Sequence, residues 1–248
     1  LPGGAMAKAT VSSSRRSIEQ ILAGNDPRLV VIAGPCSVHD PVALLDFAHQ
    51  FQAACEPLAD TLLPVLRVYF EKPRTVVGWK GLINDPDLDG SFHINKGLHL
   101  ARKVLLDVAE LGLPAASEFL DNTFGQYYAD LVSFGAIGAR TVESQIHREL
   151  ASGLSMPVGF KNGTNGHIDV AIDAIQSAAH SHWFPSLTKE GTPAILKSRG
   201  NPHGYLILRG GKQTGPNFGP AAVQQASVAL AESGLTPSLI VDCSHGNS

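Results

Sequence analysis

The feature that most constrains the fold is a regular alternation of short apolar runs with amphipathic helix patterns. Seven runs of four to six residues are apolar at most successive positions: residues 29–33, 65–70, 115–119, 135–139, 158–161, 205–208 and 239–242. Continuous apolar runs of this length are typical of strands covered on both faces. Strands that alternate with helices predict βαβ units and a parallel sheet.

Helix signals lie between the predicted strands. Asp40 followed by Pro41 predicts the N-cap and first turn of a helix that runs through Phe51. Asn95 is expected to cap a second helix, which ends before Gly112. Further helices are predicted over residues 146–153, 168–175 and 220–234. Ahead of the repeat, Ser17 and Gln20 suggest the capping box of a short helix that ends near Gly24.

Seven strands with no return to a doubly wound order predict an α/β fold of the (β/α)8 TIM-barrel type. We expect an N-terminal extension over residues 1–27 and barrel units one to seven over residues 28–248. Residues 182–198 break the alternation and predict an inserted β-hairpin around residues 189–191. The chain opens without an initiator Met and stops directly after the seventh strand, so we expect it to be truncated.

Composition excludes several classes of protein. With 44 % hydrophobic and 17 % charged residues, the chain is unlike a disordered protein. No apolar run reaches the length of a membrane span, and the N-terminus lacks the apolar core of a signal peptide. Three widely spaced cysteines cannot form a complete disulfide framework, which favours a cytoplasmic location. A net charge of −3 argues against nucleic-acid or anionic-membrane partners.

Cations gather where the predicted strands end, which is where a barrel carries its chemistry. These six residues are Arg67, Lys72, Arg74, Arg140, Lys161 and Arg209. Solvated loop charges would explain any one of them, but their equivalent positions favour a site for more than one phosphate or carboxylate group. Gly210 and Gly211 could bring backbone N–H groups to an anion, and a plain turn explains them equally well.

Two other strand ends carry metal-binding side chains. Cys36 follows the first predicted strand, and His245 follows the seventh. A thiolate and an imidazole suit Zn, Fe, Cu, Co or Mn, although a complete site needs further ligands. A structural cysteine, or a Cys36–His39 nucleophile pair, is the competing interpretation. Glu118 ends the third strand and could position a water molecule, pair with a lysine or neutralise one of the cations.

Five motifs of this chain resemble those of the type I 3-deoxy-D-arabino-heptulosonate 7-phosphate (DAHP) synthases, the aromatic-amino-acid-regulated class. The resemblance runs from about Arg15 to Ser248. The motifs are Gly34-Pro35-Cys36-Ser37, Arg67-Val68-Tyr69-Phe70-Glu71-Lys72-Pro73-Arg74-Thr75, Gly135-Ala136-Ile137-Gly138-Ala139-Arg140, Gly159-Phe160-Lys161-Asn162-Gly163 and Leu208-Arg209-Gly210-Gly211.

The resemblance implies the metal-dependent condensation of phosphoenolpyruvate with erythrose 4-phosphate, the first step of the shikimate pathway. The phosphoenolpyruvate-binding residues that it implies are Arg67, Lys72, Arg140, Lys161 and Arg209. Arg74 and Thr75 match residues that hold the aldose phosphate. Cys36 and His245 match ligands of a divalent metal (Mn, Fe, Co or Zn), and Glu118 matches an active-site acid. Lys72 is implied to polarise the aldehyde together with the metal.

The same family supplies two acidic metal ligands, a Glu and an Asp, from an eighth βα unit that these 248 residues do not contain. We therefore expect residues 1–248 alone to be inactive. Family members are inhibited by an aromatic amino acid, and Leu150, Leu154, Ser155 and Phe184 match the effector region. A homodimer or homotetramer is also implied.

Three alternatives remain open. A 3-deoxy-octulosonate 8-phosphate synthase also uses phosphoenolpyruvate, but the run Lys72-Pro73-Arg74-Thr75 argues against it. A Schiff-base aldolase would use Lys161 as its nucleophile, because neighbouring cations could lower the pKa of that lysine. A non-catalytic barrel would bind phosphometabolites without joining them.

Overall fold

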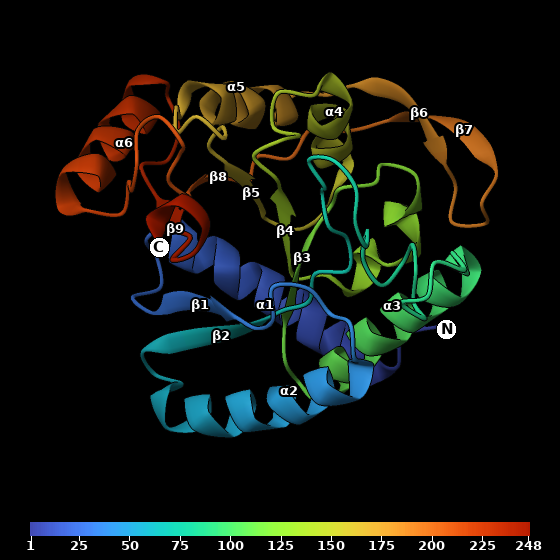
Figure 1. The fold of residues 1–248 in the computed structure, drawn as a ribbon. Coiled ribbons are helices and arrows are strands. Elements are labelled where there is room, and N and C mark those ends of the chain that lie inside the picture. The colour runs from blue at the N-terminus through green and yellow to red at the C-terminus, as the bar shows by residue number, and fades with distance from the viewer. The chain divides into compact units, whose positions relative to one another are not determined.

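Helices and parallel strands alternate along residues 1–248 in this computed structural model (Figure 1). The residues divide into two units. The first contains Leu1–Ile21, Asn25–Gly135 and Leu187–Thr192, and the second contains Leu22–Gly24, Ala136–Ser186 and Pro193–Ser248. Strand β4 (Phe134–Ile137) carries the chain from the first unit into the second.

The first unit is built on three parallel strands in the order β1-β2-β3. Strand β1 (Leu29–Ala33) pairs with β2 (Leu62–Arg67) from Leu29↔Leu62 onward, and β2 pairs with β3 (Ala115–Glu118) through Leu66↔Ala115. Parallel pairing brings the carboxyl ends of these strands to one edge of the sheet. Residues that follow the strands in sequence therefore become neighbours in space.

Three helices accompany these strands. They are α1 (Ala5–Leu22), α2 (Pro41–Cys55) and α3 (Ile94–Glu110), with short 3-10 turns over Glu56–Leu58, Phe124–Tyr127 and Ala129–Leu131. Helix α2 runs beside β1 and β2 (Figure 1), and the Asp40 carboxylate accepts hydrogen bonds from the backbone N–H groups of Val42 and Ala43. Helix α3 buries Ala101, Val104, Leu105 and Val108.

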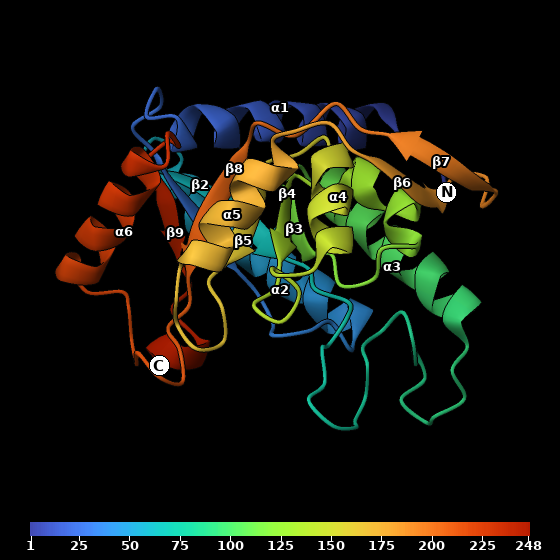
Figure 2. The same cartoon turned by 90° about the horizontal axis from the view of Figure 1, so that it is seen from above.

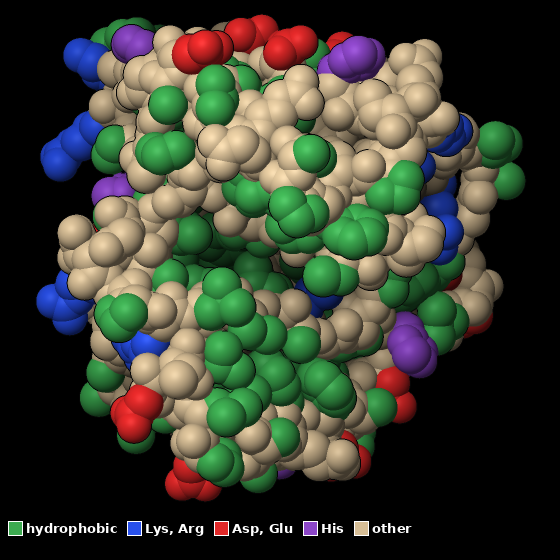
Figure 3. All heavy atoms as spheres, turned by 90° about the vertical axis from the view of Figure 1, so that its left-hand side faces the viewer, with side chains coloured by type: hydrophobic (Ala, Val, Ile, Leu, Met, Phe, Trp, Pro, Cys, Tyr) green, Lys and Arg blue, Asp and Glu red, His purple; other side chains and the backbone are tan.

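One face of the first unit keeps apolar side chains in contact with solvent. Hydrophobic side chains gather over β1 and α2 in the lower half of Figure 3. Leu29 is 64 % exposed, and the other residues of β1 are only half-buried. Strand β1 is therefore the outer strand of its unit, in contact with β2 along one edge.

The second unit is a further set of parallel strands with helices against them. Strand β5 (Val158–Lys161) pairs with β8 (Gly204–Leu208), which pairs with β9 (Leu239–Val241). Its helices are α4 (Gln145–Gly153), α5 (Asp169–Ala178) and α6 (Pro220–Glu232), followed by a 3-10 turn over His245–Asn247. Figure 2 shows α4 beside α5, which packs on β5 and β8. Gly204 permits this approach, because a Cβ there would lie 2.9 Å from Ile175.

The parallel α/β fold predicted from the alternation is confirmed, with all seven strands present. The inserted hairpin is confirmed as β6 (Trp183–Leu187) and β7 (Pro193–Lys197). Strand β2 begins at Leu62 and ends at Arg67, so residues 68–70 lie beyond it. These three side chains are buried, and the Val38 N–H donates to the Tyr69 carbonyl oxygen at 2.8 Å.

Two predicted helix starts were wrong. Helix α1 begins at Ala5, so Ser17 lies inside it and caps nothing. Thr10 and Ser14 are buried on the packed face of α1. Because both are polar, they interrupt the regular spacing of apolar residues from which a helix is predicted, so the first turns of α1 were missed. Helix α3 begins at Ile94 with His93 at the N-cap, which places Asn95 in its first turn.

Helix α1 is tied to the segment that leads into β4. The Arg15 guanidinium donates to the carbonyl oxygen of Val132 at 2.9 and 2.7 Å and to that of Ala129 at 2.7 Å. The Ser14 hydroxyl donates to the Ser133 hydroxyl at 2.8 Å. Burial lowers the pKa of Arg15, while the charges of Asp130 and Glu19 partly offset this effect. None of the helices is long and apolar enough to span a membrane.

We predict that Arg15→Ala destabilises the fold by about 1–3 kcal/mol, because two carbonyl groups lose a charged donor. Arg16→Ala is the matched control, since Arg16 is the adjacent arginine and its side chain is exposed. Urea unfolding monitored by circular dichroism measures both free energies. Equal losses for the two variants would contradict a role of Arg15 in holding α1.

Candidate active site

The loop after β1 is held tightly against β2. Gly34 has a φ of 154°, and a Cβ at this position would lie 2.6 Å from the carbonyl oxygen of Arg67. The Arg67 side chain donates to the carbonyl oxygens of Pro35 at 3.1 Å and Cys36 at 3.2 Å. Its guanidinium also lies 3.9 Å from the ring centroid of Tyr69. Arg67 therefore fixes the backbone on which Cys36 is carried.

Lys72 is brought to the same loop. Its Nζ donates to Cys36 Sγ at 2.7 Å, although the two residues are 36 positions apart in the sequence. Cys36 is exposed and Lys72 is half-buried. Cys36 Sγ therefore has a cation as its neighbour, and cysteine binds metal ions as the thiolate.

Residues 72–80 form a loop with a closed base. Glu71 and Gly81 form an antiparallel bridge, and the Lys72 N–H donates to the Lys80 carbonyl oxygen at 2.8 Å. Only glycine fits at position 81, because a Cβ there would lie 1.9 Å from the carbonyl oxygen of Phe70. Inside the loop, Arg74 Nε donates to the Trp79 carbonyl oxygen at 2.7 Å.

A pocket of about 630 Å³ opens beside this loop. The loop contributes Lys72, Arg74, Val76, Val77 and Lys80 to its wall, and Phe92 and Asp121 lie among the residues of the other walls. The pocket thus combines three cations and two acidic residues, Glu71 and Asp121, with apolar surface. Thr75, which the sequence paired with Arg74, is exposed in the same loop.

Glu71 is a buried carboxyl group at the base of the loop. Its Oε2 accepts a hydrogen bond from the Asp121 N–H at 3.2 Å. Burial raises the pKa of Glu71 to about 7, and the negative charges of Asp121 and Glu118 add to this effect, while hydrogen bonds from the backbone of Asp121 and Leu120 oppose it. Glu118 itself is buried at the end of β3, where the sequence placed an active-site acid.

The hydroxyl of Tyr128, also in the first unit, has a raised pKa. Tyr128 is fully enclosed, so burial, with the charges of Glu71 and Asp121, raises its pKa well above the ordinary value. The Tyr128 ring stacks on Phe119 at 5.6 Å between centroids. The low-polarity surroundings that keep Tyr128 neutral therefore extend towards Glu71.

The second unit carries an Asp-His pair next to a lysine. His245 Nδ1 lies 2.9 Å from Asp242 Oδ2. Burial alone would raise the pKa of Asp242, but hydrogen bonds from His245 and the Ser244 N–H, with the positive charges of Lys161 and His245, lower it to about 2. Lys161 is buried at the end of β5. The carboxylate of Asp242 is thus ionised at neutral pH and orients the imidazole.

Arg209 and Arg140 follow β8 and β4 as expected. The Arg209 side chain is half-buried, and Arg140 is exposed. The structure does not support anion binding by the backbone of Gly210 and Gly211. The Gly210 N–H donates to Asn217 Oδ1 at 2.7 Å, and the Gly211 N–H donates to the Gly215 carbonyl oxygen at 3.0 Å. Both donors are used within the protein, so these glycines form a turn.

The predicted residues thus divide between the units. Cys36, Arg67, Lys72, Arg74, Thr75 and Glu118 lie in the first, and Arg140, Lys161, Arg209 and His245 lie in the second. Within the first unit the structure brings together Arg67, Cys36 and Lys72. Within the second it places Lys161 and His245 around Asp242.

The four predicted effector residues all belong to the second unit. Leu150, Leu154 and Phe184 are buried, and Ser155 is exposed just after α4. A Cβ on Gly153 would lie 3.4 Å from the Phe184 ring, so the end of α4 lies against β6. The Ser152 and Ser198 hydroxyls add a hydrogen bond of 2.7 Å between α4 and the residue after β7.

The donor chemistry of Cys36 and His245 suits a divalent transition metal. Cys36 has an ammonium beside its sulfur, and Asp242 holds Nδ1 of His245, so that Nε2 is the nitrogen available to a metal ion. The structure brings no group of three or more His, Cys, Asp or Glu side chains together in a way that could hold a metal ion. Each of these two side chains thus offers one donor of a type that such an ion accepts.

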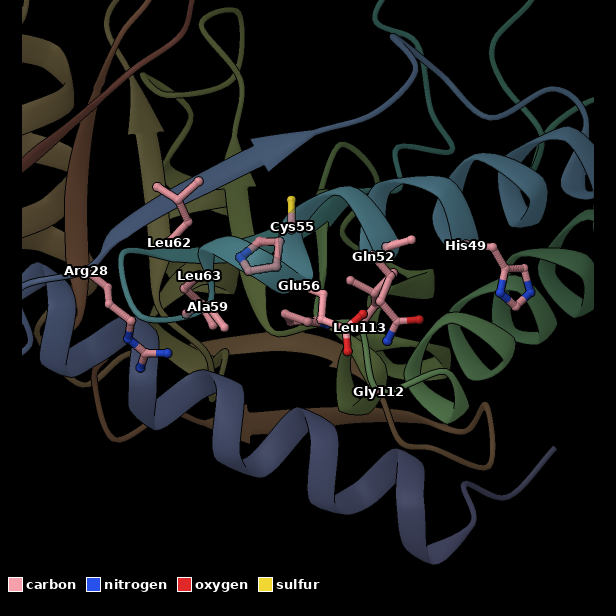
Figure 4. A pocket seen from close by; sticks show the side chains of 13 residues that line it. Arg28, His49, Gln52, Cys55, Glu56, Ala59, Leu62, Leu63, Gly112 and Leu113 are labelled. Carbon is pink, nitrogen blue, oxygen red and sulfur yellow. The ribbon is translucent and has the colours of Figure 1, made fainter.

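A second pocket, of about 500 Å³, lies at the amino ends of β2 and β3 (Figure 4). Leu62, Leu63 and Leu113 form part of its apolar wall, and Arg28 and Glu56 supply charge. Gln52 Nε2 donates to the Leu111 carbonyl oxygen at 2.8 Å. None of the predicted site residues lines this pocket, because they follow the strands at the carboxyl ends.

Sequence analysis missed Glu71 and Asp242, and also Asn162 and Asn217, whose amide oxygens accept hydrogen bonds from the N–H groups of Arg209 and Gly210. Asp242 stands three residues before His245, and this spacing was a usable signal for a carboxylate that orients an imidazole. Glu71 is adjacent to Lys72 within a quoted motif, but only the fold shows that it is buried.

We predict that Glu71 makes stability depend on pH. Between its usual pKa of 4.5 and its raised pKa of about 7, the folded protein keeps the proton while the unfolded chain loses it. The free energy of unfolding should therefore fall as pH rises from about 5 to 7, by up to about 3 kcal/mol, and level off above pH 7.

Urea unfolding of the wild type and Glu71→Gln at pH 5, 6, 7 and 8 measures this effect. Glutamine does not titrate, so the fall that Glu71 causes should disappear. Glu110→Gln is the control, since Glu110 is exposed at the end of α3. If Glu71→Gln follows the wild-type profile, the carboxyl of Glu71 does not hold its proton in the folded state.

Comparison with known proteins agrees with the geometry. Residues 7–248 match the model of the DAHP synthetase I family. The Tyr-sensitive phospho-2-dehydro-3-deoxyheptonate aldolase of Escherichia coli K12 is 56 % identical over 241 residues, 97 % of this chain and 67 % of the relative. The Phe-sensitive enzyme of the same organism is 57 % identical over 247 residues, which is 100 % of this chain and 70 % of the relative.

A solved structure is also similar over almost the whole chain. The phospho-2-dehydro-3-deoxyheptonate aldolase of Francisella tularensis SCHU S4 superposes with a TM-score of 0.97 at 51 % sequence identity. The match covers 99 % of this chain and 72 % of the other. The family match, the high identity and the shared fold together show that this chain belongs to the DAHP synthetase I family.

Proposed function

We propose that this protein condenses phosphoenolpyruvate with erythrose 4-phosphate and water to give DAHP and inorganic phosphate, the first step of the shikimate pathway. The observation that carries the proposal is the Lys72–Cys36 contact beside a cationic pocket, within a chain of this family. We further propose that the parallel strands belong to a (β/α)8 barrel, as the strand–helix alternation suggests.

Phosphoenolpyruvate needs cations for its phosphate and its carboxylate. In the first unit Arg67 and Lys72 would supply them, and in the second unit Arg140, Lys161 and Arg209. Arginine suits this task because its planar group binds two oxygens at once. Arg74 and Thr75, in the loop that Glu71 and Gly81 close, would bind the phosphate of erythrose 4-phosphate.

The reaction forms one C–C bond and one C–O bond, the latter from water to C2, and breaks the C2–O bond to the phosphate group. C3 of phosphoenolpyruvate attacks the aldehyde carbon, and the aldehyde oxygen takes a proton, which the Lys72 ammonium would give. Water then adds its oxygen to C2 and gives up one proton, which would return to Lys72. The C2–O bond to the phosphate group breaks as the new C2 hydroxyl passes its proton to the departing phosphate, which leaves the C2 ketone and inorganic phosphate. Cations that hold both anionic substrates offset their mutual repulsion and fix their orientation.

Cys36 and His245 would be two ligands of a divalent metal, which in this family of reactions would polarise the aldehyde oxygen. Arg67 would hold the backbone of Cys36, and Asp242 would orient His245. Glu118, buried at the end of β3, would position the attacking water.

We predict that Lys72→Met lowers kcat/KM by at least about 100-fold, because an aimed cation at the reacting oxygen is lost. Lys8→Met is the matched control, since Lys8 is an exposed lysine of α1 that does not line the pocket. Phosphate release from phosphoenolpyruvate by the full-length protein, with and without erythrose 4-phosphate, measures the activity. EDTA should abolish it, and an added divalent metal should restore it.

Release that does not need erythrose 4-phosphate, or activity that survives EDTA, would contradict the proposed reaction. Wild-type turnover in Lys72→Met would contradict the role of Lys72.

Two of the relatives are described as Tyr-sensitive and Phe-sensitive, which supports a regulatory site for an aromatic amino acid in this chain. We propose that Leu150, Leu154, Ser155 and Phe184 form it, where α4 meets β6. At least one of Phe, Tyr and Trp should inhibit the full-length protein, and Ser155→Tyr, which fills space beside α4, should raise the half-inhibitory concentration about tenfold or more. Unchanged activity at saturating levels of all three amino acids would refute this regulation.

A further inference from the structure

Three asparagine side chains connect the strand ends of the second unit. Asn162 follows β5, Asn217 lies between β8 and α6, and Asn247 follows β9. Asn162 and Asn217 are buried and Asn247 is half-buried. A buried amide must find partners for its donor and its acceptor, so its hydrogen bonds restrict where its neighbours can lie.

The amides converge on the backbone of Arg209 and Gly210. The Arg209 N–H donates to Asn162 Oδ1 at 2.8 Å, and the Gly210 N–H donates to Asn217 Oδ1 at 2.7 Å. Asn217 Nδ2 in turn donates to Asn162 Oδ1 at 3.1 Å. The two amides therefore hold the backbone N–H groups on both sides of the Arg209 Cα, from which its side chain projects.

The third asparagine extends the network to β9. Asn247 Oδ1 accepts from the Asn217 N–H at 2.7 Å, and its Nδ2 donates to the carbonyl oxygens of Leu208 at 3.2 Å and Asp242 at 2.9 Å. The Gly246 N–H donates to the Arg209 carbonyl oxygen at 3.0 Å. The backbone at Arg209 is thus held from β5 and from β9.

Two of the three asparagines are close in sequence to the proposed site residues Lys161 and His245. Lys161 directly precedes Asn162, and His245 stands two positions before Asn247. A hydrogen bond to Asn217 also satisfies the N–H of Gly210. Gly210 has a φ of 67°, and a Cβ at this position would lie 2.4 Å from the carbonyl carbon of Gly246. The turn after β8 therefore has little freedom to move once the amides are in place.

We propose that Asn217 is a positioning residue for phosphoenolpyruvate binding, which acts by fixing the backbone of Arg209 through Gly210 and Asn162. The inference rests on the proposed function of Arg209. Asn217 uses both ends of its amide, since Oδ1 accepts from Gly210 while Nδ2 donates to Asn162. Its removal leaves a buried N–H and a buried amide oxygen each short of one partner, and frees the turn that carries Arg209.

Asn201 offers a matched control in the same unit. It is buried to a similar extent, and its Nδ2 donates to the Met156 carbonyl oxygen at 2.9 Å while its Oδ1 accepts from the His203 N–H at 3.0 Å. Asn201 precedes β8, whereas Arg209 follows it. Asn217→Ala and Asn201→Ala therefore remove equivalent buried amides at opposite ends of one strand.

The test uses the full-length wild type and both variants. Calorimetric titration with phosphoenolpyruvate gives its Kd, and steady-state assays give KM for each substrate. Asn217→Ala should raise Kd and KM for phosphoenolpyruvate about tenfold or more, and leave KM for erythrose 4-phosphate within about twofold, because Arg74 and Thr75 belong to the other unit. Asn201→Ala should lower Tm by a similar amount and leave both values for phosphoenolpyruvate unchanged.

Equal phosphoenolpyruvate constants in the two variants would overturn the role of Asn217, as would a parallel rise of KM for both substrates. If Asn217→Ala does not fold, Asn217→Ser replaces it, because a serine hydroxyl is too short to bridge Gly210 and Asn162, and the same expectations hold. A wild-type protein that binds no phosphoenolpyruvate would instead overturn the proposed function, and the inference with it.

Discussion

Parallel strand pairing is the constraint on which the functional part of this structure depends. Because β1 and β2 run in the same direction, Cys36 and Lys72 emerge from the same edge of the sheet and come within hydrogen-bonding distance. The pairing of β5, β8 and β9 brings to one edge the strand ends at or after which Lys161, Arg209 and His245 lie. Residues that are spread over more than 200 positions of the sequence thereby form two local groups of side chains, one in each unit.

Support for these groups comes from backbone contacts more than from side-chain pairs. Gly34, Gly81 and Gly210 each stand where any Cβ would meet another backbone atom at 2.6 Å or less. Close approach of this kind leaves each of these loops only one position to occupy. Arg67 and the three asparagines add hydrogen bonds to the same loops.

The sequence was sufficient to predict features that follow from local patterns. Apolar runs identified all seven strands, and Asp40 with Pro41 located the start of α2. The pattern failed at α1, where Thr10 and Ser14 are buried polar residues of the packed face. It could not show that Glu71 is buried or that Asn217 bonds to Gly210, because both depend on which loops meet in three dimensions.

The boundaries of the two units have a consequence for how such a protein can be divided. The chain leaves the first unit at Leu22, returns at Asn25, leaves again at Ala136, and comes back for the hairpin turn Leu187–Thr192. No single cut in the polypeptide would separate one unit whole from the other. A gene exchange at any one point would therefore transfer only part of at least one unit, even between Glu118 and Arg140, where it would separate the two sets of site residues.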